Sequence, residues 1–357
     1  MVFGGASVIF DRIRDHDFHP IKDGFTYDRN LDTQGVADLR DRDWKVRTFA
    51  VRDLVQLGNS IEGDLIAALN DRNSHIRHIA TKVLGILHSE TAVSDLEKTL
   101  LEDDDEVVRA QAAVSIWQIG KKRSLGALRK AKTSDESKDV MHQAELAIHA
   151  IRKGYTATPE LKKAYENISE QTFNEVEEGK KAPDFTLPDT DENEWRLSDK
   201  IGEKPIVLIW IFADWCPVCH NEFSELIEMR EELEPEIQFA TLECHDLYPA
   251  RVMVGKEFEP KYWFSDKPFY KKYVKKIWWP HLADRAALVG MRYGVQPMAY
   301  TVHAEWINRP AVVIIDEEGM VRVTYYGTFW GDRPSIKDIQ QMIQNRTYNF
   351  VSPEKLE

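Results

Sequence analysis

The chain has 357 residues, 43% of them hydrophobic and 30% charged, a composition typical of a globular protein with about two domains. Its formal net charge of −13 argues against nucleic acid and against an anionic membrane surface as partners. Three cysteines in a chain of this length exclude a disulfide-stapled secreted scaffold.

Residues 1–30 form an N-terminal arm rich in Asp, Arg and His, without clear periodicity. The first ten residues have no basic segment ahead of an apolar one, so we expect no export signal. The longest apolar run is far shorter than the roughly 18 residues of a membrane span. The sequence therefore predicts a soluble cytoplasmic protein.

Residues 31–154 contain an internal repeat. An acidic stretch and an aliphatic residue precede Arg47, Arg77 and Arg109, at offsets of 30 and 32 residues, and a fourth, degenerate copy falls at Val140-Met141. Such periods predict a solenoid of stacked helix pairs, with each acidic opening capping a helix and each Arg bonded to acids of the neighbouring repeat. An alanine follows each Arg by three residues and a large aliphatic follows by seven: Ala50, Ala80, Ala112, Leu54, Leu84 and Ile116.

This repeat resembles the HEAT-like repeats of phycobilisome lyases. The resemblance implies a surface that docks a protein partner, and a plain helical spacer is the alternative. Such repeats carry no chemistry of their own, so function must be argued from a site elsewhere. Residues 155–178 predict a connecting helix, from Pro159 to Phe173, followed by an acidic linker.

Residues 179–350 predict an α/β domain, with residues 351–357 as a tail. Its elements are a buried strand at 206–212, a helix from Cys216, a strand at 237–243, a hairpin turning at Glu318-Gly319 and a final helix at 335–344. An excursion over 247–309 separates the second strand from the hairpin. The order is β-α-β, excursion, β-β-α.

The motif Cys216-Pro217-Val218-Cys219 lies between the buried strand and its helix. Two thiols at this spacing can form and release a disulfide with little backbone movement. Unpaired N–H groups at a helix N-terminus favour a thiolate, so we expect the pKa of Cys216 to lie below its free value of about 8.5. Cys216 is then the expected nucleophile and Cys219 the resolving thiol.

Three motifs together resemble the thioredoxin-like redoxin branch, related to AhpC/TSA proteins, over about 170 residues. They are G-x-x-A-P-D-F-x-L from 179, W-C-P-V-C from 215 and R-P-A-V-V-I-I-D-E-E-G from 309. The resemblance implies a thioredoxin fold, catalytic roles for Cys216, Cys219 and the adjacent Trp215, and a cis Pro310 beside the thiols. It also implies a thioredoxin-type or low-molecular-weight thiol as electron donor.

The family comparison separates two activities. Peroxiredoxins carry Pro, Thr and Arg where this chain has Ile209, Ala213 and Pro310, so we expect disulfide exchange rather than efficient peroxide reduction. Thioredoxins carry a buried acid where this chain has Trp210. Another group must then accept the proton, and the candidates are Asp214, His220, which we place on the solvent side of its helix, Glu243 and His245.

Cys244 follows the second strand, at the sheet edge where ligands of open α/β sheets bind. Three roles are open for Cys244. It is a small residue packed in the core, or a second resolving thiol, or one ligand of a thiophilic metal site with Cys216, Cys219 and His245. Residues 216–220 also spell a haem-attachment signature, which needs an exported chain. We expect no cofactor.

The excursion is dense in aromatic residues and contains His281 and His303. We expect a helical insert with its own aromatic core, and a roof over Cys216 is the alternative. Faint likeness to the deiodinase branch adds reductive dehalogenation, beside peroxide reduction, as an alternative activity. A metal-binding or redox-sensing scaffold without catalysis is a further alternative to the predicted thiol–disulfide oxidoreductase.

Overall fold

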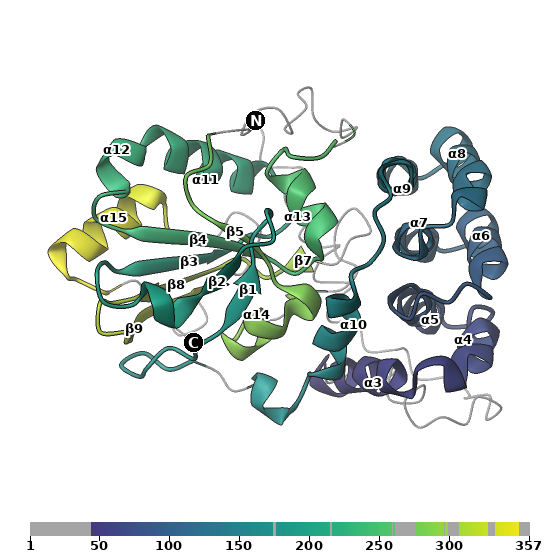
Figure 1. The fold of residues 1–357 in the computed structure, drawn as a ribbon, viewed down its shortest axis with the longest axis horizontal. Coiled ribbons are helices and arrows are strands. Elements are labelled where there is room, and N and C mark those ends of the chain that lie inside the picture. Colours follow the sequence, from purple (N-terminus) through teal and green to yellow (C-terminus); the bar gives the residue numbers. More distant parts are fainter. Residues whose placement is uncertain are drawn as a thin grey trace, which may run out of the picture. The chain divides into compact units, whose positions relative to one another are not determined.

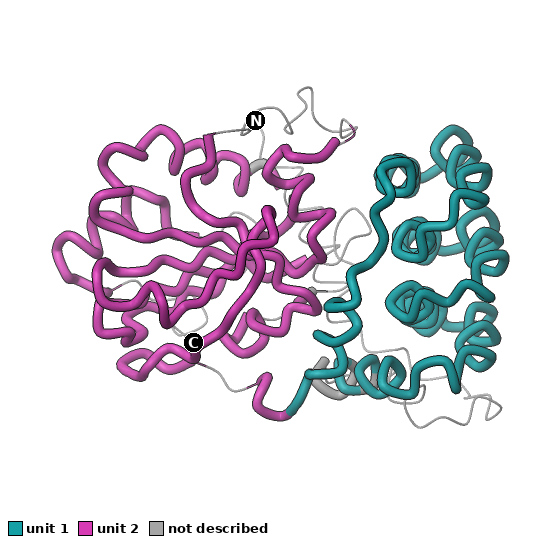
Figure 2. The backbone as a smooth tube through the Cα atoms, viewed as in Figure 1, with its two compact units in different colours: residues 1–169, 299–306 teal, residues 170–298, 307–357 magenta. Residues whose placement is uncertain are grey.

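The computed structural model describes residues 44–173, 176–214, 216–258, 260, 276–295, 297–298, 307–327 and 333–349. The described residues form two compact units, the first ending at Ser169 and the second beginning at Glu170 (Figure 2). The predicted arm at 1–30 and the tail at 351–357 lie outside the described residues. No helix in the described part of the chain is long and apolar enough to cross a membrane.

The first unit is helical, as the repeat predicts. Helices α5, α7 and α9 stack in one row and α4, α6 and α8 in another (Figure 1). Its elements are α3 (Trp44–Leu57), η1 (Gly58–Ile61), α4 (Glu62–Ala68), α5 (Ser74–Ile86), α6 (Val93–Glu102), α7 (Glu106–Ile119), η2 (Lys122–Ser124), α8 (Leu125–Ser134), α9 (Lys138–Lys153) and α10 (Pro159–Glu166). The helix predicted over 159–173 is shorter than expected, because α10 ends at Glu166 and a separate 3₁₀ turn, η3 (Glu170–Phe173), follows.

Repeat positions explain how these helices begin and pack. The side chains of Asn73 and Asp105 accept hydrogen bonds from the N–H groups of His75 and Val107, which caps α5 and α7. The described alanine and aliphatic positions of the repeat are buried, namely Ala80, Ala112, Leu54, Leu84 and Ile116. The small alanines let neighbouring helices approach closely while the aliphatic side chains fill the space between the rows.

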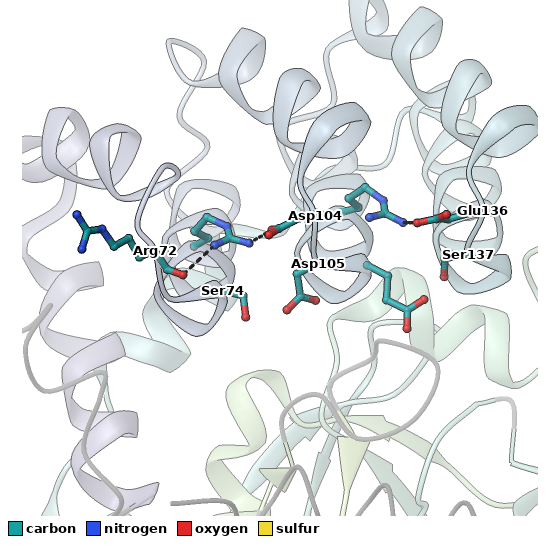
Figure 3. A pocket seen from close by; sticks show the side chains of 9 residues that line it. Arg72, Ser74, Asp104, Asp105, Glu136 and Ser137 are labelled. Atoms are coloured by element: carbon teal, nitrogen blue, oxygen red, sulfur yellow. Dashed lines mark hydrogen bonds and ion pairs between the residues drawn. The ribbon is translucent and has the colours of Figure 1, made fainter. Parts of the chain in front are cut away.

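The predicted arginine ladder is present between repeats. Arg77 donates to both carboxylate oxygens of Asp103, at 2.8 and 2.7 Å, and also bonds Asp104. Arg109 donates to both carboxylate oxygens of Asp135, each at 2.9 Å. Both arginines line a cavity of about 730 Å³ in the solenoid; the other lining residues are Arg72, Ser74, Asp104, Asp105, Glu106, Glu136 and Ser137 (Figure 3).

The second unit contains a five-stranded mixed sheet in the order β5-β4-β3-β8-β9. Its strands are β3 (Ile206–Trp210), β4 (Gln238–Glu243), β5 (His281–Ala283), β8 (Ala311–Ile315) and β9 (Val321–Tyr326). Strands β3, β4 and β5 are parallel, whereas β8 is antiparallel to both β3 and β9. The hairpin turns at Gly319, whose φ of +77° requires the left-handed region that glycine adopts easily.

Further elements surround this sheet. Helix α11 (Pro217–Glu228) lies on one side and α14 (Leu288–Arg292) on the other (Figure 1). The remaining elements are β1 (Thr186–Pro188), β2 (Glu194–Arg196), η4 (Leu197–Lys200), α12 (Arg230–Leu233), α13 (Leu247–Met253), η5 (Arg285–Ala287), β6 (Pro297–Met298), β7 (Ile307–Asn308) and α15 (Ile336–Asn345). The order β-α-β, excursion, β-β-α is the predicted one.

The excursion does not form a separate helical core in its described part. It supplies β5 to the central sheet, and its aromatic residues pack on the sheet's own core. The ring of Trp279 lies 5.2 Å from that of Phe223 in α11, and Tyr293 lies 5.4 Å from Trp210 in β3. The prediction of an independent insert is wrong here because these aromatics cover the two faces of the sheet. Residues 261–275 and 299–306, including His303, lie outside the described residues.

Candidate functional site

The two thiols of the C-x-x-C motif sit where β3 gives way to α11. Cys216 is the N-cap residue of α11, Pro217 occupies the first helical position, and Cys219 lies in the first turn. The fixed φ of proline suits that position and its missing N–H would be unpaired there anyway. Both sulfurs are reduced, and both residues are 0% exposed. The two thiols therefore do not differ in exposure, and exposure does not distinguish the expected nucleophile from the resolving thiol.

Cys219 receives two hydrogen bonds at its sulfur. The N–H of Phe212 donates to Sγ at 3.3 Å and Nη2 of Arg333 donates at 3.4 Å. Nη1 of the same guanidinium bonds Oε2 of Glu222 at 2.6 Å, and the Arg333 and Glu222 side chains are each 4% exposed. A buried positive charge is thus shared between a thiol and a carboxylate.

These contacts reverse the expected ionisation of the two cysteines. Burial opposes the thiolate of Cys219, but the Cys216 thiol, the charge of Arg333 and the N–H groups of Ala213 and Phe212 outweigh it and lower its pKa to about 5. Burial and the adjacent Cys219 raise the pKa of Cys216 well above its ordinary value. The prediction of a low pKa at Cys216 is wrong because the residue is buried and the hydrogen-bond donors point at Cys219 instead.

Helical spacing alone would place Glu222 on the polar face of α11, but the residue is buried. Burial raises its pKa to about 7 despite the charge of Arg333. Burial disfavours the cation of Arg333, but Cys219 and Glu222 outweigh it and raise the pKa of the guanidinium. Sequence patterns missed both residues: Arg333 lies 114 positions from Cys219, and the helical spacing Cys219-Glu222 was the only available signal.

The residues at the carboxyl end of β4 form a second buried network. Oε2 of Glu243 lies 3.1 Å from Nε2 of His281, whose Nδ1 lies 2.8 Å from the Thr241 hydroxyl. On its other side Glu243 faces His245 at 3.6 Å. Burial opposes the carboxylate, but the bonds from His245 and His281 prevail and lower the pKa of Glu243 to about 2. Ionised this firmly, Glu243 is a poor proton acceptor near neutral pH.

Two other predicted proton acceptors, His220 and Asp214, are both buried in the structure. His220 is 2% exposed rather than on the solvent side, and its Nε2 donates to the backbone carbonyl of Asp214. Asp214 is buried as well, at 6% exposed. The first turn of α11 therefore faces inward, which amphipathic spacing did not indicate. The predicted Trp215 lies outside the described residues.

Pro310 directly precedes β8, as the resemblance implies, but its peptide bond is trans. All peptide bonds among the described residues are trans. The segment before β8 stays extended because it is hydrogen-bonded on both sides. The N–H of Asn308 donates to the carbonyl of Phe212, and the carbonyl of Pro310 accepts from the N–H of Gly327.

The proposed metal set is not assembled. In the described part of the chain, which includes Cys216, Cys219, Cys244 and His245, no three His, Cys, Asp or Glu side chains are grouped to hold a metal ion. Cys244 is 4% exposed. The metal alternative therefore has no geometric support here, and the role of Cys244 stays open.

Comparison with known proteins finds a matching family for each of the two regions of the chain. Residues 178–324 match the AhpC/TSA family, and residues 36–117 match HEAT repeats. The chain is a HEAT-repeat region followed by an AhpC/TSA redoxin domain. Both parts of the predicted resemblance are confirmed.

Two curated relatives are similar to the redoxin domain. "Thiol-disulfide oxidoreductase ResA" of Geobacillus thermodenitrificans is 28% identical over 167 residues, 47% of this chain and 76% of that protein. "Thiol:disulfide interchange protein DsbE" of Allochromatium vinosum is 28% identical over 145 residues, 40% of this chain and 63% of that protein. The chain thus spans less than two thirds of the second relative.

Solved peroxiredoxin structures are similar as well. The reduced 2-Cys peroxiredoxin of Plasmodium vivax is 20% identical with a TM-score of 0.38, and the match covers 48% of this chain and 98% of that one. Peroxidoxin BcpB of Mycobacterium tuberculosis is 17% identical with a TM-score of 0.36, covering 49% of this chain and 99% of that one.

Proposed function

We propose that the redoxin domain is a thiol–disulfide oxidoreductase in which Cys216 and Cys219 cycle between dithiol and disulfide. Two reduced sulfurs one helical turn apart, with a buried guanidinium on one of them, carry this proposal. The similarity to two thiol–disulfide exchange proteins supports it. Catalysis in the AhpC/TSA family also includes peroxide reduction, so the substrate class needs a direct test.

The proposed reaction begins at Cys216, the residue at the start of α11. Its thiol shares a hydrogen bond with Cys219, so the pair holds one proton and one negative charge at neutral pH. Transfer of that proton to Cys219 leaves Cys216 as the thiolate that attacks a substrate disulfide. The first substrate sulfur leaves and takes up one proton from its surroundings. Cys219 then attacks the Cys216 sulfur, and its proton passes to the second substrate sulfur, which leaves as a thiol. Two electrons pass from the pair to the substrate.

Peroxide reduction is disfavoured by what surrounds the motif. The positions of the peroxidase Pro, Thr and Arg hold Ile209, Ala213 and Pro310, and none of these side chains donates a hydrogen bond. Losing one donor to a developing anion costs roughly 10² to 10³ in rate. Both cysteines are 0% exposed, so a disulfide as well as a peroxide reaches them only after local opening, and the comparison between the two depends on the missing donors.

Stopped-flow measurement on one reduced preparation tests the proposal. Exchange with oxidised glutathione should be faster than oxidation by hydrogen peroxide, and Cys216→Ser and Cys219→Ser should each abolish turnover. Cys244→Ser is the matched control and should retain it. A peroxide rate that exceeds the disulfide rate would replace the proposal with a peroxidase.

The solenoid is proposed to dock a protein partner of the redoxin domain. Trapping on Cys219→Ser, which stalls the mixed disulfide on Cys216, should capture the substrate in the full chain and less of it in a chain lacking residues 31–154. Equal capture would leave the solenoid as a spacer. The thiol electron donor and the cytoplasmic location stay predictions, to be checked by reconstitution and by fractionation.

A further inference from the structure

Arg333 connects two acidic groups, the thiol of Cys219 and the carboxyl of Glu222. Its Nη2 lies 3.4 Å from Sγ of Cys219 and its Nη1 lies 2.6 Å from Oε2 of Glu222. Glu222 follows Cys219 by three residues on α11, so both side chains lie on one face of the helix. Arg333 reaches them from the segment that leads into α15.

One buried cation cannot stabilise two buried anions fully. A second ionised group beside the first raises the cost of both, because like charges repel strongly away from water. Among the described residues Oε1 of Glu222 has no hydrogen-bond partner, so this carboxyl is incompletely stabilised there as an anion. The charged or titratable groups acting on Glu222 are Arg333, Cys219 and Glu225, and those acting on Cys219 are Arg333 and Cys216.

We propose that Arg333 is a catalytic residue that holds the Cys219 thiolate, and that Glu222, a positioning residue acting through Arg333, exchanges the proton of the dithiol cycle. The inference rests on the proposed function. In the reduced protein Arg333 faces the Cys219 thiolate and Glu222 is protonated. When the disulfide forms, the thiolate charge is gone and Glu222 ionises as the remaining partner of Arg333. The pKa of Glu222, raised by burial to about 7, fits a group that changes state near neutral pH.

Atoms and electrons balance in this scheme. The reduced side is the Cys216 thiol, the Cys219 thiolate, the Glu222 carboxylic acid and a substrate disulfide. The oxidised side is the Cys216–Cys219 disulfide, the Glu222 carboxylate and two substrate thiols. The S–S bond of the substrate breaks, the S–S bond of the protein forms, and two electrons move to the substrate. The two protons that its sulfurs need come from Cys216 and Glu222.

A further consequence concerns redox poise. A cation that stabilises the thiolate stabilises the reduced form, so it makes the disulfide a stronger oxidant. Replacing Arg333 should therefore shift the equilibrium with glutathione toward the protein disulfide. A tenfold shift in that equilibrium constant corresponds to about 30 mV for a two-electron couple.

Thiolate absorbance near 240 nm, titrated in the full-length dithiol protein, tests Arg333 without any substrate. Arg333→Met should raise the midpoint by at least one pH unit and shift the glutathione equilibrium at least tenfold toward the disulfide. Arg333→Lys should restore part of both effects. An unchanged midpoint in a folded Arg333→Met protein would overturn the assignment of Arg333.

Proton counting tests Glu222 and needs no Arg333 variant to fold. When the reduced protein is oxidised by glutathione disulfide at pH 6, an indicator dye should register almost no net proton uptake. Glu222→Gln should take up one proton per disulfide formed, and Glu228→Gln, an exposed change on the same helix, should behave as the parent. Equal uptake in Glu222→Gln and the parent would overturn the role of Glu222. Absence of any exchange in the parent would instead refute the proposed function, while the thiolate titration would still report on Arg333.

Discussion

Removing Asp135 should destabilise the solenoid far more than removing the residue next to it. Arg109 is 6% exposed, and Asp135 holds its guanidinium with two hydrogen bonds of 2.9 Å. Glu136 lies 3.8 Å from the same guanidinium, but its side chain is 90% exposed. The two acids thus offer a buried and a solvated partner for one arginine.

The magnitude follows from the charge that is left behind. Asp135→Ala leaves a buried guanidinium without its counter-ion, which costs about 3–5 kcal/mol. Glu136→Ala removes a surface contact worth less than about 1 kcal/mol. At about 1.36 kcal/mol per tenfold, Asp135→Ala should lower protection from hydrogen exchange in α7 and α9 roughly 150- to 5,000-fold. Glu136→Ala should lower it less than about fivefold.

Hydrogen exchange followed by mass spectrometry of α7 and α9 peptides makes this measurement in the full chain, because it separates the solenoid from the redoxin domain. Peptides from β3 and β8 serve as the internal reference and should be unaffected. Similar losses of protection in the two variants would refute the reasoning, since burial would then not determine the strength of this ion pair.

Three further changes test the packing and the buried acids. Gly85→Ala should lower the unfolding free energy by about 1–3 kcal/mol in thermal melts, because the new Cβ would lie 2.8 Å from Cα of Ser115; an unchanged Tm would contradict the tight contact of α5 with α7. Glu243 has a pKa below its unfolded value, so it stabilises the fold above about pH 4.5, and this is lost as the pH falls toward 2. Glu243→Gln should therefore lose about 3 kcal/mol at pH 6 and almost nothing at pH 2 in urea titrations; a pH-independent loss would contradict the lowered pKa. The folded state raises the pKa of Asp284 to about 7, mainly by burial, so its contribution is present below about pH 4 and is lost as the pH rises through 7. The stability of Asp284→Asn relative to the parent should then rise by up to about 4 kcal/mol from pH 4 to pH 8, and a flat difference would refute the shift.

Local patterns predicted most of the fold. The apolar run at 206–212 and the turn at Gly319 place β3 and the β8–β9 hairpin correctly, because hydrophobic runs and turn glycines act within a few residues. The arginine ladder was predictable for the same reason, since the repeat brings each arginine to the acids 26 residues later. The three-residue strand β5 was missed, because its sequence His281-Leu282-Ala283 has no strand pattern of its own.

The chemistry of the site was less predictable than its location. The C-x-x-C motif identified the two sulfurs, but the lowered pKa of Cys219 depends on the Cys216 thiol and also on Arg333, which lies 114 residues further along the chain. The inward position of His220 and Glu222 depends on what packs against α11, which spacing within the helix cannot reveal. Pairing across the fold, rather than local sequence, decides these properties.

The ladder also bears on how long this array of repeats can be. Met141 stands 32 residues after Arg109, where a further arginine would continue the series. A duplicated unit inserted between α7 and α9 would bring its own arginine and its own acid, so the array can grow internally by recombination. A unit added after α9 would place its acids opposite Met141, which cannot bond them as Arg77 and Arg109 bond theirs. The degenerate final copy therefore ends the arginine ladder ahead of the redoxin domain, and any lengthening of the array has to occur before it.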